Sequence, residues 1–598
     1  MKTFNYALTK IKDPKTKQWK NIPVLKGESA YEIAVRLGTF SGTEEDYNND
    51  IINISVMRDI MNKTPHATTA KKYYNLKRTG KVYQTKVWKF ATNPTTTCEK
   101  LLDNAGLEFI PSTDTVEGKD DYLNGDHPLF EWVYCNYKRN DDGTPYPIAT
   151  EFDSNYAESG SVDVGAMQMS FYWNWDASNP AYDLVTISDM PNEKYGLKPW
   201  TECVGSDGTI LPYCIGSAFF SGTASDGLLH SQPNIEPQKY QSYNNIMTNY
   251  PKKGKGYKGA GVERNTFGII FDIIKGANKS SQKIHSGCTN YNLQYNASIV
   301  SDDPHDYFPV TNAQATNLVV GSIVSVGYGS INGTSVNNDR GVTTMHKYVN
   351  NKRISKIETL DSNNKAIYFE GNITPFNTAK VKLNDTLSAN VIISTMPWYS
   401  GTTKNVIGKH DGSFISNTSG KYPYRVQGRE YAVGGYSVAS NVVMIFKSDY
   451  SKYVYVAQKG VTRTSDEAKI KSTYKLIGNI PGNDGTDFWI GDTGVDVETG
   501  GTYPKIIGSS DSQGTGDRCY AGGKTTSGTR EYLQGGNLRN GSNTGSSYVA
   551  CRNRLSTGNW NYLGANCIIQ LFFLYHISYS KRIFSFRTNV GRCLKLFL

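Results

Sequence analysis

Residues that could carry out chemistry are sparse in this chain of 598 residues, and their spacing fits no common catalytic pattern. The glycine- and lysine-rich stretch 254–261 has the composition of a phosphate-binding loop, but it lacks the Gly-Lys-Ser/Thr ending that would hold phosphates and Mg²⁺. The sequence also lacks the His-Glu-x-x-His pattern of zinc hydrolases and the Gly-x-Ser-x-Gly turn of serine hydrolases. We therefore interpret 254–261 as a flexible basic loop, predict no catalytic residue and do not expect an enzyme.

Residues able to bind metals are equally scattered. The eight His residues show no ligand spacing, and one of them, His305, lies in the acidic loop 302–306. Carboxylates in such a loop could bind Ca²⁺, but a solvated turn is the simpler interpretation. The nine Cys residues form no Cys-x-x-Cys pair, which favours reduced thiols in a protein made in a cytoplasm, although a disulfide within the last domain stays open. We expect no metal site and no cofactor.

Paired carboxylates are the remaining catalytic option. Glycoside hydrolysis needs two carboxyl groups at a defined separation, and this separation is a three-dimensional quantity that a sequence does not contain. A polysaccharide depolymerase therefore stays open as an alternative.

Composition excludes several classes of protein. Aromatic residues make up 12% and charged residues 20%, so the chain is too aromatic and too weakly charged to be disordered. No apolar stretch reaches the roughly 18 residues of a membrane-spanning helix, and the first residues lack the apolar core of a secretory signal. The net charge of +10 is concentrated after residue 500, and such a basic end can attract anionic polymers. No nucleic-acid-binding motif is recognised, so we expect no nucleic-acid partner. Because no apolar stretch is long enough, we also expect no integral membrane segment.

The segment 528–566 combines closely spaced Gly residues with Asn and Ser. Gly permits backbone conformations with positive φ, and Asn and Ser hydrogen-bond to their own backbone, so the segment should form ordered loops. Apolar residues such as Leu538 and Trp560 can anchor these loops, whereas the polar residues between them add little to a core. Polar side chains held on a fixed frame are typical of recognition loops.

Motifs in this segment resemble a known fold. Gly535-Gly536 is followed by Asn540-Gly541-Ser542-Asn543 and then by Asn559-Trp560-Asn561. This pattern resembles the ligand-binding end of the C-type-lectin fold of the formylglycine-generating-enzyme type, and most of all the variable proteins diversified by retroelements, as on phage tail tips. The stretch 424–430 is similar to the strand and turn near the start of that fold. The resemblance covers residues 395–567.

The resemblance implies a set of ligand-contact residues, which are the polar positions between the fixed Gly and Trp residues. These predicted contact residues are Asn537, Arg539, Asn540, Asn543, Ser546, Tyr548, Arg552, Asn553, Arg554, Asn559, Asn561 and Tyr562. The alternative is that they only hold the Gly-rich loop together. Such folds usually end soon after the Asn-Trp-Asn stretch, whereas here the apolar and basic tail 568–598, of unknown role, follows.

A second resemblance lies near the amino terminus. Ser29 is placed to cap a helix, with Glu32 completing a capping box, and 41–45 begins a second helix with acidic residues in its first turn. The stretch 27–45 resembles a short helical module that recurs in phage tail fibres and related surface proteins.

Alternation of apolar and polar residues, as in 81–90 and 162–171, predicts strands through much of the chain. A helix is predicted near 266–276, and because it is apolar on nearly all sides it should pack between layers. We expect a mainly β fold with some α (α+β), in a multidomain, fibre-like chain. The predicted domains are a 1–80 attachment region with the helical module, an 81–307 β-rich middle domain, a 308–394 small antiparallel barrel or sandwich, a 395–567 C-type-lectin-like receptor-binding domain and the 568–598 tail.

These features predict a phage tail-fibre or tail-tip receptor-binding protein, located in the virion and made in the host cytoplasm. Its expected partners are a host cell-surface receptor (glycan or protein), other virion tail proteins and further copies of itself, with a trimer favoured. Recognition would be reversible, and several copies on one particle would add avidity. A fibre-borne polysaccharide depolymerase and a bacterial surface adhesin are the alternatives.

Overall fold

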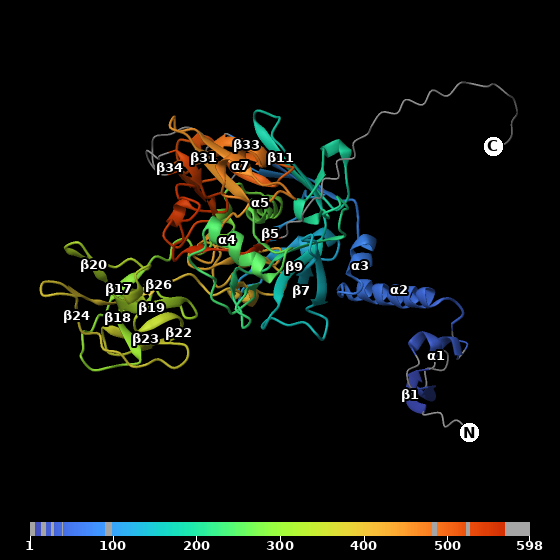
Figure 1. Cartoon of the computed structure of the whole chain (residues 1–598), viewed down its shortest axis with the longest axis horizontal. Helices are drawn as coiled ribbons and strands as arrows, with labels where there is room; N and C mark the ends of the chain where they lie inside the picture. Colours follow the sequence, from blue (N-terminus) through green and yellow to red (C-terminus); the bar gives the residue numbers. More distant parts are fainter. Residues whose placement is uncertain are drawn as a thin grey trace.

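The computed structural model describes residues 6–12, 19–25, 29–36, 38, 40–89, 98–480, 487–521 and 527–567 (Figure 1). Strands account for 33% of the chain and helices for 19%, which confirms the predicted mainly β fold with some α. Figure 1 shows a broad body, one domain at its side and a helical arm near the amino terminus, instead of a row of separate domains. The predicted tail 568–598 lies outside the described residues.

The amino-terminal arm contains a β-hairpin and three helices. Strands β1 (Tyr6–Lys12) and β2 (Trp19–Leu25) pair antiparallel, and helices α1 (Ala30–Arg36), α2 (Glu44–Asn62) and α3 (Ala70–Leu76) follow. Figure 1 shows α1 lying well away from the body, with α2 and α3 between them.

Both helix starts expected in this arm are confirmed. The Glu32 amide donates to the Ser29 hydroxyl (3.2 Å), and the Ser29 amide donates to the Glu32 carboxylate (2.7 Å). Thr43 and Asp46 form the same reciprocal pair at the start of α2, at 3.1 and 2.9 Å. Because a capping box uses only neighbouring residues, these two helices begin where the local sequence dictates.

Two antiparallel sheets form the first half of the body. One has the strand order β12-β10-β11-β3-β4 and the other β13-β9-β7-β8. Their strands are β3 (Val82–Trp88), β4 (Cys98–Leu102), β7 (Trp132–Arg139), β8 (Pro145–Thr150), β9 (Asp163–Met169), β10 (Tyr172–Asp176), β11 (Tyr182–Ser188), β12 (Lys198–Pro199) and β13 (Tyr213–Ser217).

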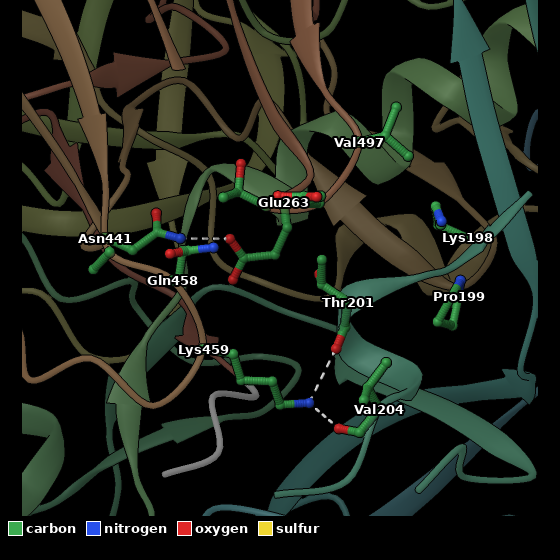
Figure 2. A pocket seen from close by; sticks show the side chains of 12 residues that line it. Lys198, Pro199, Thr201, Val204, Glu263, Asn441, Gln458, Lys459 and Val497 are labelled. Atoms are coloured by element: carbon green, nitrogen blue, oxygen red, sulfur yellow. Dashed lines mark hydrogen bonds between the residues drawn. The ribbon is translucent and has the colours of Figure 1, made fainter. Parts of the chain in front are cut away.

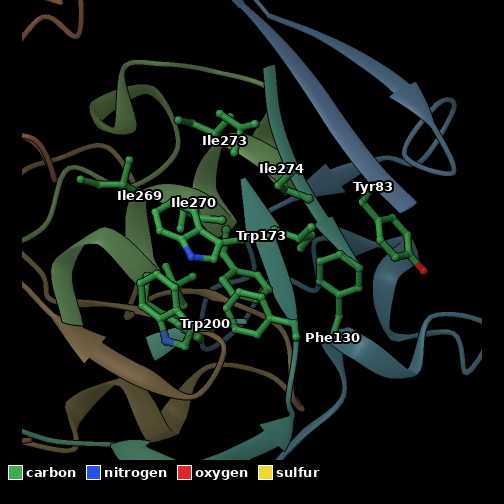
Figure 3. Packing of buried hydrophobic residues seen from close by; sticks show 14 of the residues in the cluster. Tyr83, Phe130, Trp173, Trp200, Ile269, Ile270, Ile273 and Ile274 are labelled. Atoms are coloured by element: carbon green, nitrogen blue, oxygen red, sulfur yellow. The ribbon is translucent and has the colours of Figure 1, made fainter. Parts of the chain in front are cut away.

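Helix α5 (Val262–Gly276) runs through the body with nearly all of its side chains buried, which confirms the expected buried helix. Figure 3 shows its Ile270 among the rings of Trp173, Trp200 and other aromatic residues. The helix begins earlier than the predicted 266, because the Asn441 side-chain oxygen accepts a hydrogen bond from the first helical amide at 2.8 Å. That partner lies far along the chain, so local sequence could not reveal it.

A domain is inserted between the two halves of the body. It is built on a six-stranded antiparallel sheet of order β17-β26-β19-β22-β23-β18, and it has a hydrophobic cluster of its own. The strands are β17 (Gln294–Asn296), β18 (Tyr307–Thr311), β19 (Ile323–Tyr328), β22 (Val349–Thr359), β23 (Asn364–Phe369) and β26 (Val391–Thr395). The inserted domain thus begins at β17, before the predicted residue 308, because Gln294–Asn296 pairs with its last strand.

The second half of the body has short strands separated by long loops. A seven-stranded sheet has the order β35-β34-β36-β39-β38-β30-β40, a four-stranded sheet the order β33-β32-β31-β37 and a three-stranded sheet the order β27-β28-β29. The strands are β27 (Gly412–Ser413), β28 (Tyr424–Val426), β29 (Arg429–Tyr431), β30 (Tyr436–Val438), β31 (Val442–Phe446), β32 (Lys452–Val456), β33 (Lys475–Ile480), β34 (Asp487–Asp496), β35 (Gly501–Gly508), β36 (Arg518–Tyr520), β37 (Gly528–Arg530), β38 (Leu533–Gln534), β39 (Val549–Ala550) and β40 (Tyr562–Leu563).

The two halves of the body share one core, which differs from the predicted division between 81–307 and 395–567. Tyr424 and Tyr431 pack in the same cluster as α5 and the first sheet. Strand β16 (Lys258–Gly259) pairs antiparallel with β41 (Asn566–Cys567). A helix that is apolar on all sides must be covered on all sides, but its sequence does not show which segments cover it.

Buried ion pairs also join the halves. The Lys275 ammonium on α5 lies 2.8 Å from Asp120 and 2.7 Å from Asp411, and all three side chains are buried. The Arg429 guanidinium lies 2.6 Å from the buried Glu202 carboxylate. Breaking such a pair leaves a buried charge without its partner, so each pair ties one half to the other.

Candidate binding face

Four tyrosines lie where neighbouring strands of the seven-stranded sheet meet. Tyr436 begins β30, Tyr520 ends β36, Tyr548 directly precedes β39 and Tyr562 begins β40. The parallel pairs β36·β39 and β30·β40 bring these strand ends together. Three of the tyrosines belong to one hydrophobic cluster, and Tyr520 packs against it.

Ring contacts make this group a stiff base. The Tyr436 and Tyr548 rings are stacked with centroids 6.1 Å apart, and the Tyr562 ring meets the Tyr436 ring edge-on at 5.7 Å. Aromatic pairs of this kind contribute about 0.5–1.5 kcal/mol beyond the area that they bury.

Polar side chains of the Gly-rich loops cover the tyrosine hydroxyls. The Asn540 side-chain nitrogen donates to the Tyr548 hydroxyl at 3.1 Å, and the Asn553 side-chain nitrogen donates to the Tyr562 hydroxyl. These bonds fix the two half-buried asparagines on the aromatic base.

Arginines lie at the outer side of the same group. The Arg552 guanidinium donates to the Tyr520 hydroxyl at 2.5 Å and lies 4.5 Å from the centroid of its ring. Burial raises the pKa of Tyr436, and its hydrogen-bonding neighbours Tyr548 and Asn540, followed by the charges of Arg552 and Arg539, oppose that rise. Arg539 directly precedes Asn540 in the chain, and its guanidinium lies 5.0 Å from the centroid of the Trp560 ring. The Tyr–Arg face is defined as Tyr436, Tyr520, Tyr548, Tyr562, Asn540, Asn553, Arg539 and Arg552.

The loop that carries Asn540 has a rigid frame. The Asn537 backbone amide donates to the Asn540 side-chain oxygen (2.7 Å), and the Arg539 backbone amide donates to the Asn537 side-chain oxygen (2.8 Å). Gly536 has φ +67°, and a Cβ atom there would lie 2.0 Å from the Thr544 side chain. Only Gly fits this position, because it tolerates both the left-handed backbone and the close approach.

The structure places seven of the twelve predicted contact residues at the surface. Arg539, Arg552 and Arg554 are exposed, while Asn540, Asn543, Asn553 and Asn559 are half-buried. Four of these seven lie on the Tyr–Arg face. Of the other three, Asn559 adjoins the face through its backbone, because its carbonyl accepts hydrogen bonds from the Tyr562 amide (3.0 Å) and the Tyr240 amide (2.9 Å). Burial lowers the pKa of Arg530, and the charge of Arg554 lowers it further.

The other five predicted contact residues are buried, which corrects their expected outward placement. They are Asn537, Ser546, Tyr548, Asn561 and Tyr562, with exposures between 3% and 6%. Ser546 faces the core, where its amide donates to the Ser281 hydroxyl. The Asn561 carbonyl accepts a hydrogen bond from the Tyr436 amide. Asn537 supports the loop frame, because its side-chain oxygen accepts the Arg539 backbone amide, whereas the Asn561 side-chain oxygen is buried without a hydrogen-bond partner within the described residues.

Charge on the Tyr–Arg face is positive. Its exposed cations are Arg539 and Arg552, and Asp339 lies 4.0 Å from the first of them. Glu531 is a neighbour of Tyr562, and burial raises the pKa of Glu531 to about 9, which keeps this carboxyl neutral at pH 7. Buried tyrosines with protonated hydroxyls and exposed guanidinium groups can bind acceptor-rich or aromatic ligands without covalent chemistry.

Sequence reasoning missed two members of the face, Tyr436 and Tyr520. Tyr436 follows Gly434-Gly435, a pattern that predicts a turn without showing what the turn adjoins. Their place depends on parallel pairing with strands far along the chain, which leaves no local signal.

A separate cavity of about 360 Å³ lies between the two halves of the body (Figure 2). Two carboxylates, Glu263 and Glu498, are among its lining residues. The Asn441 amide donates to Glu263 at 2.9 Å, and Glu498 forms an ion pair with Lys475 at 2.6 Å. Lys459, on the opposite wall in Figure 2, donates to the carbonyls of Thr201 and Val204.

Within the described ranges, no group of three or more His, Cys, Asp and Glu side chains is arranged to hold a metal ion. In that same part of the chain, none of the helices combines the length and the apolar character needed to cross a bilayer. Comparison with protein-family models and with the curated proteins found no match to this chain.

Proposed function

We propose that this chain is a receptor-binding protein of a phage tail fibre or tail tip, which attaches to a host cell-surface glycan or protein through the Tyr–Arg face. The observation that carries the proposal is the pairing of exposed arginines with a stiff tyrosine base on glycine-framed loops. Tyr and Arg dominate the energetic centres of protein interfaces, and a preordered surface loses little entropy on binding. The C-type-lectin-like fold of 395–567 is part of this proposal and rests on the sequence motifs.

Recognition by this face is reversible and needs no bond-making step. Arg552 and Arg539 would contact acceptor groups of the receptor, while Asn540 and Asn553 would exchange part of their hydrogen bonding with it. A single contact patch of this size binds weakly, so several copies on one particle supply avidity.

The arm offers a surface for self-association, and we include a homo-oligomer, with a trimer favoured, in the proposal. On helix α2, Ile51, Ile54, Met57 and Met61 form an apolar stripe, with Ile54 71% and Met61 79% exposed. Residues three and four apart lie on one side of a helix, so the stripe can pack against the same stripe of further copies. Sedimentation velocity of the full chain and of Ile54→Glu tests this, with exposed Asn49→Glu as control. Loss of the oligomer only in Ile54→Glu supports the contact, and a monomeric wild type contradicts it.

Binding of the full chain to a panel of bacterial strains tests the attachment function. Arg552→Ala should lower cell binding about tenfold, because removing a central interface arginine costs about 1–2 kcal/mol or more. Lys382→Ala, an exposed lysine of the inserted domain, serves as the control. Binding to none of the strains, or unchanged binding of Arg552→Ala, would count against the proposed face.

The depolymerase is the second candidate function, favoured by the cavity that holds Glu263 and Glu498. Product analysis of capsular and envelope polysaccharides incubated with the chain tests it. Fragmentation that is lost in Glu263→Gln or Glu498→Gln supports an enzyme, while binding without fragmentation supports attachment alone.

A further inference from the structure

A second cavity, of about 530 Å³, lies between the inserted domain and the body. One wall comes from the body, through Gln238, Tyr240 and Trp560, and the other comes from Gly341 to Asn351 of the inserted domain. Its volume lies within the about 300–1,000 Å³ of small-molecule sites. None of the residues of the Tyr–Arg face lines it, so it is a different site from the proposed receptor face.

Trp560 supplies an unused hydrogen-bond donor at this cavity. Its side chain is 1% exposed, and its indole nitrogen has no hydrogen-bond partner within the described residues. A Cβ atom on Gly341 would lie 3.7 Å from the indole Cδ1, the atom beside that nitrogen, so this edge of the ring lies against Gly341, which lines the cavity, and the nitrogen itself is covered in this structure. A buried donor without a partner costs about 1–3 kcal/mol, which a ligand that offers an acceptor would recover.

The faces of the Trp560 ring are already covered. The Arg340 guanidinium lies 5.5 Å and the Arg539 guanidinium 5.0 Å from the ring centroid. The indole edge, and not its face, is therefore what Trp560 offers to a ligand.

Tyr240 supplies the free aromatic surface. Its side chain is 46% exposed, and its backbone has φ +57°, a left-handed conformation that is costly for a residue with a large side chain. The Tyr240 amide donates to the Asn559 carbonyl (2.9 Å), and the Asn245 side chain donates to the Tyr240 carbonyl (3.0 Å). These two bonds hold the ring at the cavity in spite of the backbone strain.

The charges that line the cavity are balanced. The Lys239 ammonium lies 2.7 Å from the Glu236 carboxylate. One ring nitrogen of His346 contacts the Ser325 hydroxyl and the other contacts the Arg340 carbonyl, each at 2.8 Å. Burial lowers the pKa of His346, which keeps the imidazole neutral. Such a lining favours an uncharged ligand over an anion or a cation.

Amide groups add both donors and acceptors. Gln238 and Asn350 reach the cavity from opposite walls. Their side-chain oxygens already accept from the Thr223 hydroxyl (2.8 Å) and the Asn351 side chain (2.7 Å), but an amide oxygen can accept a second hydrogen bond while its nitrogen donates. A sugar hydroxyl has the same double character, and the apolar C–H face of a sugar ring packs well on an aromatic ring.

We propose that this cavity binds a neutral saccharide, with a sugar ring on Tyr240, an oxygen atom accepting a hydrogen bond from the Trp560 indole, and hydroxyls held by Gln238 and Asn350. The site goes beyond the proposed attachment function, because none of its lining residues belongs to the Tyr–Arg face; Arg539 of that face contacts it only indirectly, through the ring of Trp560. It also gives the inserted domain a role, since five of the thirteen residues that line the cavity come from that domain.

A glycan microarray with neutral and acidic oligosaccharides, probed with the full chain, tests the proposal. Titration calorimetry then measures the affinity for the strongest neutral disaccharide. Tyr240→Ala should weaken binding about tenfold, and Trp560→Phe, which keeps an aromatic ring but removes the donor, about fivefold. Asn350→Trp, at an exposed position, should block the cavity without disturbing the core, and Lys382→Ala is the matched control.

The outcomes separate this site from the attachment function. Binding to neutral glycans that is lost in Tyr240→Ala and Asn350→Trp supports the cavity, even if the chain binds no cell. Binding to acidic glycans alone, binding to none of the glycans, or neutral-glycan binding that the Tyr240 and Asn350 variants leave unchanged overturns it.

Discussion

The body and the inserted domain solve the problem of burying a core in opposite ways. The inserted domain builds its core from consecutive strands between residues 294 and 395. The body builds its core around α5 from segments on both sides of that insertion. The difference teaches that order along the chain predicts a domain only where its contacts are local.

Deletion variants are the strongest test of the difference between the locally built inserted domain and the body with its shared core. The Thr395 amide donates to the Leu293 carbonyl at 3.0 Å, so the two ends of the inserted domain lie side by side. Replacing 294–395 with a short Gly-Ser linker should therefore leave a folded body. Residues 396–567 alone should not fold, because α5 is missing. Circular dichroism and thermal unfolding measure both, and a cooperative transition in isolated 396–567 would contradict the shared core.

Removing a buried cation should have the next largest effect. Lys275→Met leaves Asp120 and Asp411 buried without their partner, which should lower the free energy of unfolding of the body by about 3–5 kcal/mol. Lys382→Met is the control, since it breaks an exposed pair with Asp385 in the inserted domain and should leave stability unchanged. Denaturant unfolding of the full chain checks both variants.

Removing a buried side chain from the core of the inserted domain should lower the stability of that domain alone. Ile367 is fully buried in β23, and Ile367→Ala should destabilise the domain by about 3 kcal/mol. Hydrogen exchange followed by mass spectrometry should show faster exchange between 294 and 395, with α5 unchanged. Equal loss of protection in α5 would mean that the two units unfold as one.

The smallest expected effect is a pH dependence confined to the body. Burial raises the pKa of Glu531 from its ordinary 4.5 to about 9. Between these values the folded chain keeps a proton that the unfolded chain releases, so this group makes stability fall as pH rises from 4.5 to 9. Glu531→Gln cannot ionise, so it removes this decrease in stability with pH. The substitution should raise the free energy of unfolding by about 2 kcal/mol at pH 8 and change it little at pH 5. Thermal unfolding at both pH values measures this, and an equal effect at both would show that ionisation is not the cause.

Local signals predicted the parts of the fold that local contacts build. The capping box of Ser29 and the acidic residues of 41–45 mark two helix starts, and period-2 alternation marks the strands of the inserted domain. The buried character of α5 also follows from its composition. The covering of α5 by residues such as Tyr424 depends on contacts between distant segments, which no local pattern encodes.

For the candidate site too, local sequence predicted some of the residues, while the placement of others depends on distant segments. Arg539, Asn540, Arg552 and Asn553 were predicted from the polar positions between Gly and Trp, and the structure gathers them on one face. Asn561 belongs to the same pattern but is buried, because the strand that follows it pairs beside Tyr436. A polar side chain in a Gly-rich loop can be exposed to a ligand or buried among the residues that hold the loop. Which of the two occurs depends on pairing with strands far along the chain.

Strand β41 has a consequence for how the chain is made. It is formed by Asn566 and Cys567, and its partner β16 directly precedes α5. During synthesis on the ribosome, α5 leaves the exit tunnel long before the segments after residue 395 that complete its cover have been translated. The inserted domain can fold in this interval because it needs only its own residues. We therefore expect the nascent body to depend on chaperones that shield the apolar sides of α5 until translation has passed residue 567.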